Sequence, residues 1–163
     1  MQKRKQWWKG ERGEWYVVIQ AFLLLLVIFV PHSVPWTSGW HMPESRLVCI
    51  TAAAFLLAGV LLASAGTLTL GRNLTPMPHP RDGAPLIQTG PYRLVRHPIY
   101  SGILFMALGW SVWLQSHVKL GFTLLLFIFF DLKSRREERL LAQIFPEYES
   151  YRKRVSRLVP FIY

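Results

Sequence analysis

Apolar residues are gathered into four runs along the chain, at 15–30, 47–70, 99–114 and 118–132. A helix needs about 20 residues to cross the hydrocarbon core of a bilayer. The second run is long enough by itself, and flanking Trp, Tyr and Pro extend the others into the interface. The pattern predicts an all-α integral membrane protein whose membrane helices cover 15–30, 47–70, 98–114 and 118–132.

The third and fourth runs are separated by only three residues, 115–117, which predicts an antiparallel helical hairpin. The fourth helix meets no breaker before Pro146. A helix continuing to residue 145 would be about 42 Å long, against about 30 Å for the bilayer core. Its last turns would therefore leave the membrane and carry Glu137 and Glu138 to the side on which the third helix begins.

Residues 146–155 read PEYESYRKRV, in which Tyr148, Tyr151 and Val155 recur at spacings of three and four. This period predicts a short amphipathic helix in the cytoplasmic tail. We expect that helix to lie on the membrane surface or to cap a site at the mouth of the hairpin.

Basic residues are unevenly distributed along this chain of 163 residues, whose net charge is +10. All but two of the 19 Lys and Arg residues fall within 1–14, 71–97 or 133–163. Such residues are retained on the cytoplasmic side of membrane proteins. We therefore expect a single membrane domain over 1–163, with a basic N-terminus, a loop and a C-terminal tail in the cytoplasm, as in a bacterial inner membrane.

Composition narrows the class of protein further. Nucleic-acid-binding proteins are also basic, but their apolar residues are spread over amphipathic elements, so no nucleic-acid partner is expected. The single cysteine, Cys49, excludes a disulfide within one chain, and its place in an apolar run predicts a buried packing residue. The histidines show no metal-ligand spacing, so no metal is expected. The sequence carries no indication of an oligomeric state.

The loop over 71–97 contains residue types that neither membrane topology nor attraction to lipid requires. Its prolines forbid a continuous helix. Pro98 suits the first position of the third helix, where its missing N–H costs nothing. Arg96, His97 and Tyr100 would then ring the cytoplasmic mouth of that helix, opposite the acidic pair. Attraction to anionic lipid explains most of the arginines but not the histidine and the tyrosine.

Three motifs together are similar to those of a known family. The stretch GPYRLVRHPIYSG at 90–102 is followed by EERLL at 137–141 and by a tyrosine-rich tail that contains VPF. They resemble the integral-membrane methyltransferases of the isoprenylcysteine carboxyl methyltransferase and phospholipid N-methyltransferase group. The resemblance covers roughly residues 60–163, and GRNLTPMPHP at 71–80 is similar to the bacterial branch. The matching residues are Gly90, Pro91, Tyr92, Arg96, His97, Pro98, Tyr100, Gly102, Glu137, Glu138, Leu141, Phe145, Tyr148, Tyr151, Val155 and Pro160.

The resemblance implies S-adenosylmethionine as a methyl donor bound on the cytoplasmic side. It also implies a lipid-like or membrane-partitioned acceptor that bears a carboxylate or an amine. Arg136 and Glu137 are the catalytic candidates, although Lys133 and Arg135 also precede the acidic pair, as basic residues do in the isoprenylcysteine enzymes. The glycine-x-glycine element of the phospholipid branch is absent from the third helix. The residues implied for the donor site are Tyr92, Arg96, His97, Tyr100, Glu137 and Glu138.

These residue types fit the chemistry of the donor. A carboxylate can hold its amino group, an arginine can hold its carboxylate bidentately, and an aromatic face can stabilise its sulfonium. Membrane sterol and steroid reductases, which use NADPH, share a similar RHPxY segment and a tyrosine-rich tail. Such a reductase is therefore one alternative, and a non-catalytic membrane scaffold is another.

Overall fold

The computed structural model describes residues 13–32, 46–75, 77 and 83–163. Of the basic N-terminus expected over 1–14, all but the last two residues lie outside this part of the chain. The described residues form no β-strand and one isolated bridge, between Val95 and Ser156, which confirms the all-α class. Their helices are α1 (Glu14–Phe29), α2 (Arg46–Leu70), α3 (Pro98–Trp113), α4 (His117–Ile144) and α5 (Tyr148–Arg154), with 3-10 segments η2 (Gly71–Asn73) and η3 (Gly90–Arg93).

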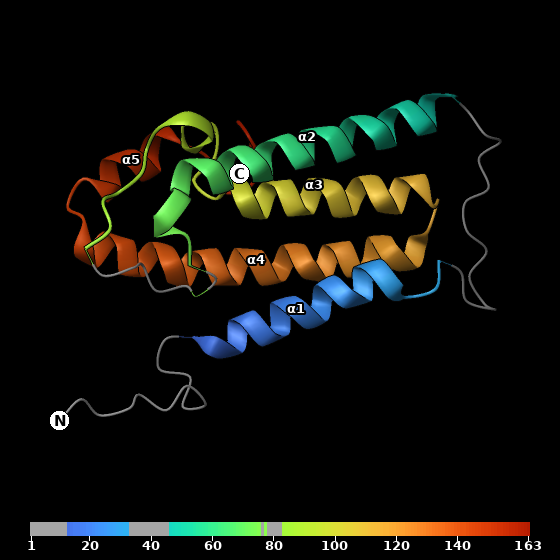
Figure 1. The fold of residues 1–163 in the computed structure, drawn as a ribbon, viewed down its shortest axis with the longest axis horizontal. Helices are drawn as coiled ribbons and strands as arrows, with labels where there is room; N and C mark the ends of the chain where they lie inside the picture. The colour runs from blue at the N-terminus through green and yellow to red at the C-terminus, as the bar shows by residue number, and fades with distance from the viewer. Residues whose placement is uncertain (1–12, 33–45, 76, 78–82) are drawn as a thin grey trace.

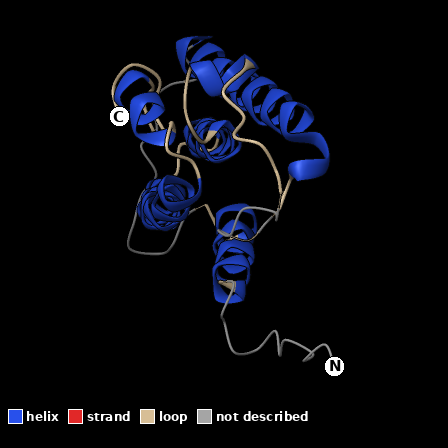
Figure 2. Ribbon diagram, turned by 90° about the vertical axis from the view of Figure 1, so that its left-hand side faces the viewer, coloured by secondary structure: helices blue, strands red, loops and turns tan. Residues whose placement is uncertain are grey.

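The long helices follow one another in space in the order α2, α3, α4, α1 (Figure 1). Helix α3 packs between α2 and α4, and α4 in turn packs against α1. Figure 2 views this bundle from the end that carries α5 and the loop before α3. That end of the bundle contains the candidate site.

Helices α2 and α3 approach closely because glycines face each other where they meet. A Cβ atom added to Gly59 would lie 2.6 Å from the carbonyl oxygen of Gly102, and one added to Gly102 would lie 2.6 Å from the backbone nitrogen of Ala63. Neither distance leaves room for a methyl group. Such small-residue contacts are a common way for helices to pack in lipid.

Helix α4 is continuous over 28 residues, from His117 to Ile144. It is therefore about 42 Å long and extends well past residue 132, as predicted from the absence of a breaker. Ser116 caps its N-terminus by accepting a hydrogen bond from the backbone N–H of Lys119 at 3.2 Å. Residues 114–116 join α3 to α4, and the two helices lie side by side (Figure 1).

Lys119 attaches α1 to the start of α4. Its buried Nζ donates to the carbonyl oxygens of Val27 at 2.9 Å, Ile28 at 3.1 Å and Val30 at 2.9 Å. The last carbonyls of a helix have no partner within that helix, and a cation complements the negative end of its dipole. The charge near the start of the fourth apolar run thus serves the packing of α1.

In the described part of the chain, one helical stretch, Arg46–Asn73, is long and apolar enough to cross a membrane. Glu14–Phe29 and Pro98–Trp113 are shorter apolar helices. Large apolar side chains are exposed on the outside of the bundle, including Phe29 at 75% and Leu68 at 80%. An outer surface of this kind is consistent with a membrane protein.

The expected burial of Cys49 is wrong. Cys49 lies on α2 and is exposed. The apolar run that contains it has few buried positions, since only Ala52, Gly59 and Gly66 of α2 are buried. An apolar sequence environment therefore does not imply burial inside the protein when the outer surface of a helix is itself apolar.

Candidate functional site

The segment before α3 is held in place by the C-terminal part of the chain. The backbone N–H of Arg96 donates to Ser156 O at 2.8 Å, and that of His97 donates to Arg157 O at 3.2 Å. His97 is then the N-cap of α3, and Pro98 is its first residue, as predicted. Two segments far apart in sequence thus fix the backbone from which the site residues project.

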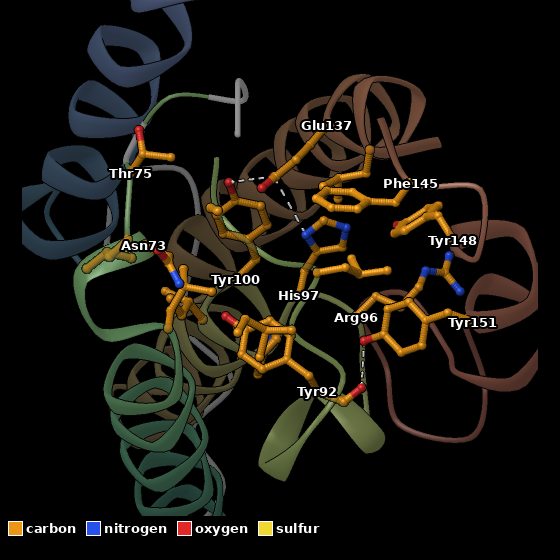
Figure 3. A pocket seen from close by; sticks show the side chains of 18 of the residues that line it. Asn73, Thr75, Tyr92, Arg96, His97, Tyr100, Glu137, Phe145, Tyr148 and Tyr151 are labelled. Carbon is orange, nitrogen blue, oxygen red and sulfur yellow. Dashed lines mark hydrogen bonds and ion pairs between the residues drawn. The ribbon is translucent and has the colours of Figure 1, made fainter. Parts of the chain in front are cut away.

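His97 lies between the two glutamates of α4. Its Nε2 is 3.2 Å from Oε1 of Glu138, and its Nδ1 is 3.7 Å from Oε2 of Glu137. Tyr100, one turn further along α3, donates to Oε2 of Glu137 at 3.1 Å (Figure 3). The structure therefore brings the RHPxY segment and the acidic pair together, as the sequence predicted.

Glu138 is the centre of a buried charge cluster behind this contact. Its Oε1 accepts from Nε of Arg96 at 2.8 Å and from Nε of Arg157 at 3.3 Å, in addition to His97. Burial alone would raise the pKa of Glu138, but hydrogen bonds from His97 and Arg96 outweigh it and lower the pKa to about 2. Glu138 is therefore ionised over the physiological range.

Arg96 also holds the C-terminal segment. Its Nη1 donates to the carbonyl oxygen of Arg152 at 2.9 Å and to that of Val155. Arg157 extends the cluster outward, since its Nη1 donates to Oδ1 of Asp131 at 2.9 Å. These contacts tie the loop, α4 and the chain after α5 into one unit.

Aromatic rings stack on the inner side of this unit. The ring of His97 is parallel to that of Tyr100, with centroids 5.4 Å apart, and Tyr100 stacks on Phe130 at 4.6 Å. Nζ of Lys133 lies 5.0 Å from the centroid of the Tyr100 ring and donates to Oε1 of Gln20 at 2.5 Å. Burial lowers the pKa of Lys133 to about 8, against the opposing effect of Glu137.

A cavity of about 300 Å³ opens beside these groups. That volume is at the lower end of the range for small-molecule sites. Its walls come from α1, α2, the loop before α3, α3, α4 and α5, and they combine apolar side chains with polar ones. The polar and aromatic residues that line it are Gln20, Asn73, Thr75, Tyr92, Arg96, His97, Tyr100, Lys133, Glu137, Phe145, Tyr148 and Tyr151.

Helix α5 covers one side of the cavity with two buried tyrosines (Figure 3). Tyr151 donates to the carbonyl oxygen of Tyr92 at 2.6 Å. The hydroxyl of Tyr148 is buried, and among the described residues it has no hydrogen-bond partner. An unpaired buried hydroxyl on a cavity wall is a group that a ligand can satisfy.

The predicted site residues fall into three groups. Five of them, Tyr92, Arg96, His97, Tyr100 and Glu137, line the cavity. Glu138 is absent from the lining and instead organises the cluster behind it. Arg136 also lies outside the lining, with its guanidinium 5.4 Å from the centroid of the Tyr16 ring on α1.

Burial raises the pKa of Glu137 above its ordinary value, although neighbouring cations and the hydrogen bond from Tyr100 act in the opposite direction. The two adjacent glutamates therefore have pKa values shifted in opposite directions. A pair of titratable groups separated in this way is typical of functional sites.

Sequence reasoning did not assign a site role to Gln20 or to Tyr148. The signal for Gln20 was an isolated amide within the apolar run 15–30, and the signal for Tyr148 was its place on the apolar face of the tail helix. Among the described residues, no group of three or more His, Cys, Asp or Glu side chains could hold a metal ion.

The fold and the site define a helical protein with an outer apolar surface and, at one end of its bundle, a cavity lined by aromatic rings and by charged groups of both signs. Residues 47–148 match the family model described as phospholipid methyltransferase. The match covers more than half of the chain, so the chain belongs to the phospholipid methyltransferase family.

Several curated proteins are related to the chain. A probable protein-S-isoprenylcysteine O-methyltransferase of Oryza sativa subsp. indica is 36% identical over 126 residues, which cover 75% of this chain and 66% of the relative. Methanethiol S-methyltransferase 1 of Bradyrhizobium diazoefficiens is 28% identical, over 98% of this chain and 60% of the relative. The cobalt-zinc-cadmium resistance protein CzcN of Cupriavidus metallidurans is 31% identical, over 91% of this chain and 62% of the relative. The chain thus spans just under two thirds of the length of these relatives.

Proposed function

We propose that the protein is an S-adenosylmethionine-dependent methyltransferase that acts on a lipid-like or membrane-partitioned acceptor at the cytoplasmic face of a membrane. The observation that carries this proposal is the position of Glu137 on the cavity wall, beside His97 and Tyr100. The family match and the printed names of the O- and S-methyltransferase relatives support methyl transfer over NADPH-dependent reduction.

The residues present fit the proposed donor. Glu137 would hold its amino group, and the ring face of Tyr92 would stabilise its sulfonium. The unpaired hydroxyl of Tyr148 would gain a hydrogen-bond partner. When bound, S-adenosylmethionine would supply an electrophilic methyl carbon.

The protein's own contribution to the reaction would be mostly positioning. Direct displacement at a methyl carbon needs the acceptor atom held in line with the bond that breaks, and an ionised acceptor needs no general base. The Glu138 cluster keeps His97 fixed, and His97 together with Tyr100 fixes Glu137. The walls from α5 and the loop would keep water away from the reacting atoms.

Of the three basic residues near the acidic pair, Lys133 is the one on the cavity wall. From the sequence, Arg136 and Glu137 were the catalytic candidates, with Lys133 and Arg135 left open as alternatives to Arg136. The position of Arg136 over Tyr16 favours Lys133 as the basic group nearest to the reaction. We therefore propose Glu137 and Lys133 as the residues that face the reactants.

The proposed topology has four membrane helices, α1 to α4, in a bacterial inner membrane. Helices α3 and α4 form a hairpin, and both termini lie on the cytoplasmic side. The apolar exterior and the basic segments support it. The cavity end of the bundle would then lie at the cytoplasmic interface. A lipid-like acceptor could reach it from the bilayer.

Equilibrium binding of labelled S-adenosylmethionine and of NADPH to the purified protein in lipid nanodiscs tests the proposal. We expect the methyl donor to bind and NADPH not to bind. Glu137→Gln and His97→Ala should weaken donor binding at least tenfold, because each removes a wall contact, while the exposed Glu149→Gln should bind as the wild type does. Preferential binding of NADPH would support the reductase, and binding of neither ligand would support a scaffold.

A further inference from the structure

Helix α1 contributes one amide side chain to the cavity. Gln20 is the only Asn or Gln in EWYVVIQAFLLLLVIF, and it lines the cavity together with Lys133 of α4. Most of the remaining surface of α1 is apolar, and much of it is exposed. A single amide at the cavity end of such a helix is best explained by its contact with Lys133.

That contact fixes the direction of a flexible cation. Oε1 of Gln20 accepts from Nζ of Lys133 at 2.5 Å, while the same Nζ lies 5.0 Å from the Tyr100 ring centroid. A lysine stem has several rotatable bonds, so an ammonium group held by two elements is far more ordered than one on a single helix. Because Gln20 is neutral, it orients the ammonium without cancelling its charge.

The charges around Lys133 indicate which acceptors the site can take. Glu137 is one helical turn away on α4 and acts on Lys133, and Tyr100 faces it from α3. Burial lowers the pKa of Lys133 to about 8, so the side chain is mostly charged at neutral pH. With Glu137 engaged by the amino group of the donor, the ammonium of Lys133 would repel a protonated amine and would attract a carboxylate or a thiolate.

We propose that Gln20 is a positioning residue for acceptor recognition, which holds Lys133 so that the cavity takes an anionic nucleophile, a carboxylate or a thiolate, in preference to an amine. This inference rests on the proposed methyltransferase function. In the transfer, a lone pair of the anionic oxygen or sulfur forms the bond to the methyl carbon. The electron pair of the broken sulfur–carbon bond stays on the donor sulfur, which becomes a neutral thioether. A carboxylate reacts without moving a proton, whereas a thiol first loses its proton to solvent to give the thiolate.

The position of α1 in the chain supports a role in specificity. The family model matches residues 47–148, which include the RHPxY segment and the acidic pair but not α1. The donor-side residues therefore belong to the region that the family model matches, and Gln20 belongs to a helix outside that model, although the alignments with CzcN and with methanethiol S-methyltransferase 1 extend over α1. A helix outside the family model is well placed to differ with the acceptor among members of the family while the donor chemistry stays the same.

Three probes with the same C12 tail test the charge preference: dodecanoate, 1-dodecanethiol and dodecylamine. Methyl transfer from labelled S-adenosylmethionine would be followed in nanodiscs at neutral pH. We expect transfer to dodecanoate or to dodecanethiol and little or none to dodecylamine. Preferred methylation of dodecylamine, or no transfer to dodecanoate or to dodecanethiol by protein that binds the donor, would overturn the inference.

Gln20→Met keeps the length of the side chain and removes the hydrogen-bond acceptor. We expect it to raise KM for the accepted anionic probe about tenfold, with the affinity for S-adenosylmethionine and the melting temperature little changed. Gln20→Glu retains an acceptor for Lys133 but adds a negative charge, so it should shift the preference toward dodecylamine. Phe22→Leu, an exposed change on the same helix outside the cavity lining, is the matched control.

The two proposals fail in different ways. If Gln20→Met leaves KM for the anionic probe unchanged while the donor still binds, the role of Gln20 is wrong and the proposed function stands. If wild-type protein does not bind S-adenosylmethionine at all, the proposed function itself is wrong.

Discussion

Arg96 donates from Nε to Oε1 of Glu138 across 2.8 Å, and both side chains are almost completely buried. The contact joins the loop before α3 to α4, and Nη1 of the same arginine binds the carbonyl of Arg152. A lysine cannot make both contacts, because its single ammonium lacks the fork geometry of the guanidinium.

The first prediction is that Arg96→Lys destabilises the protein by about 1–3 kcal/mol, the typical effect of leaving a buried hydrogen-bonding group without its partner. Thermal unfolding in detergent, followed by circular dichroism, measures this change. Arg154→Lys is the matched control, since Arg154 is exposed and its recorded bond is to a carbonyl in its own helix. Equal melting temperatures for the two variants would contradict the structural role of Arg96.

The second prediction concerns acid stability. The pKa of Glu138 is lowered from 4.5 to about 2 in the folded protein, so its ionised form stabilises the fold at every pH above 4.5. This contribution is lost as the pH falls from 4.5 toward 2. The difference in melting temperature between wild type and Glu138→Gln should therefore narrow over that range.

The pKa of Glu137 is shifted in the opposite direction, and because Glu138 contributes to that shift, Glu138→Gln also reduces it. A difference that stays constant from neutral pH down to pH 3 would show that Glu138 is not the ionised centre of the cluster.

The third prediction concerns the contact between α2 and α3. Gly59→Ala should destabilise the protein by about 1–3 kcal/mol, because its Cβ would lie 2.6 Å from the carbonyl oxygen of Gly102. Gly121→Ala on α4 is the control, since its Cβ would meet nothing within 4 Å. The control should be neutral or stabilising by about 0.5–1 kcal/mol, the usual gain for alanine in a helix. Melting temperatures in the opposite order would contradict the close contact.

The fourth prediction concerns the attachment of α1. Lys119→Met should destabilise the protein by about 1–3 kcal/mol, because it removes a donor shared by three carbonyls at the end of α1. Hydrogen exchange in α1 should increase at the same time. The same substitution at the exposed Lys153 should change neither quantity.

The fifth prediction separates ligand binding from stability at the two tyrosines of α5. Tyr148→Phe removes a hydroxyl that has no recorded partner, so it should leave the melting temperature unchanged or raise it while weakening donor binding. Tyr151→Phe should lower the melting temperature, because it removes the bond to the carbonyl of Tyr92. A Tyr148→Phe variant with full donor affinity would remove that hydroxyl from the proposed donor site.

Local patterns in the sequence predicted much of the architecture. Apolar runs defined the four long helices to within one or two residues at most ends, and the missing breaker before Pro146 predicted the extension of α4. From the short connection at 115–117 we predicted that the acidic pair would lie near His97, and in the structure both glutamates lie beside this histidine. Each of these inferences depends only on helix geometry and on residues that are close together in the sequence.

The remaining parts of the site depend on contacts between distant segments. No local period indicates that Arg157 folds back onto Glu138, or that Gln20 of the first helix meets Lys133 of the fourth. The exposure of Cys49 was missed for a related reason. Hydropathy does not distinguish a side chain that faces lipid from one that faces another helix.

Two lysines of α4 hold α1 at two points, Lys119 at its last carbonyls and Lys133 at Gln20. They are 14 positions apart in the sequence, or about 21 Å along the helix axis. A movement of α1 along its axis by one turn, about 5.4 Å, would break both attachments together. In a bilayer, the rate of the proposed methyl transfer would then depend on hydrocarbon thickness. A mismatch between that thickness and the apolar length of α1 would tilt or displace α1, and with it the amide that orients Lys133.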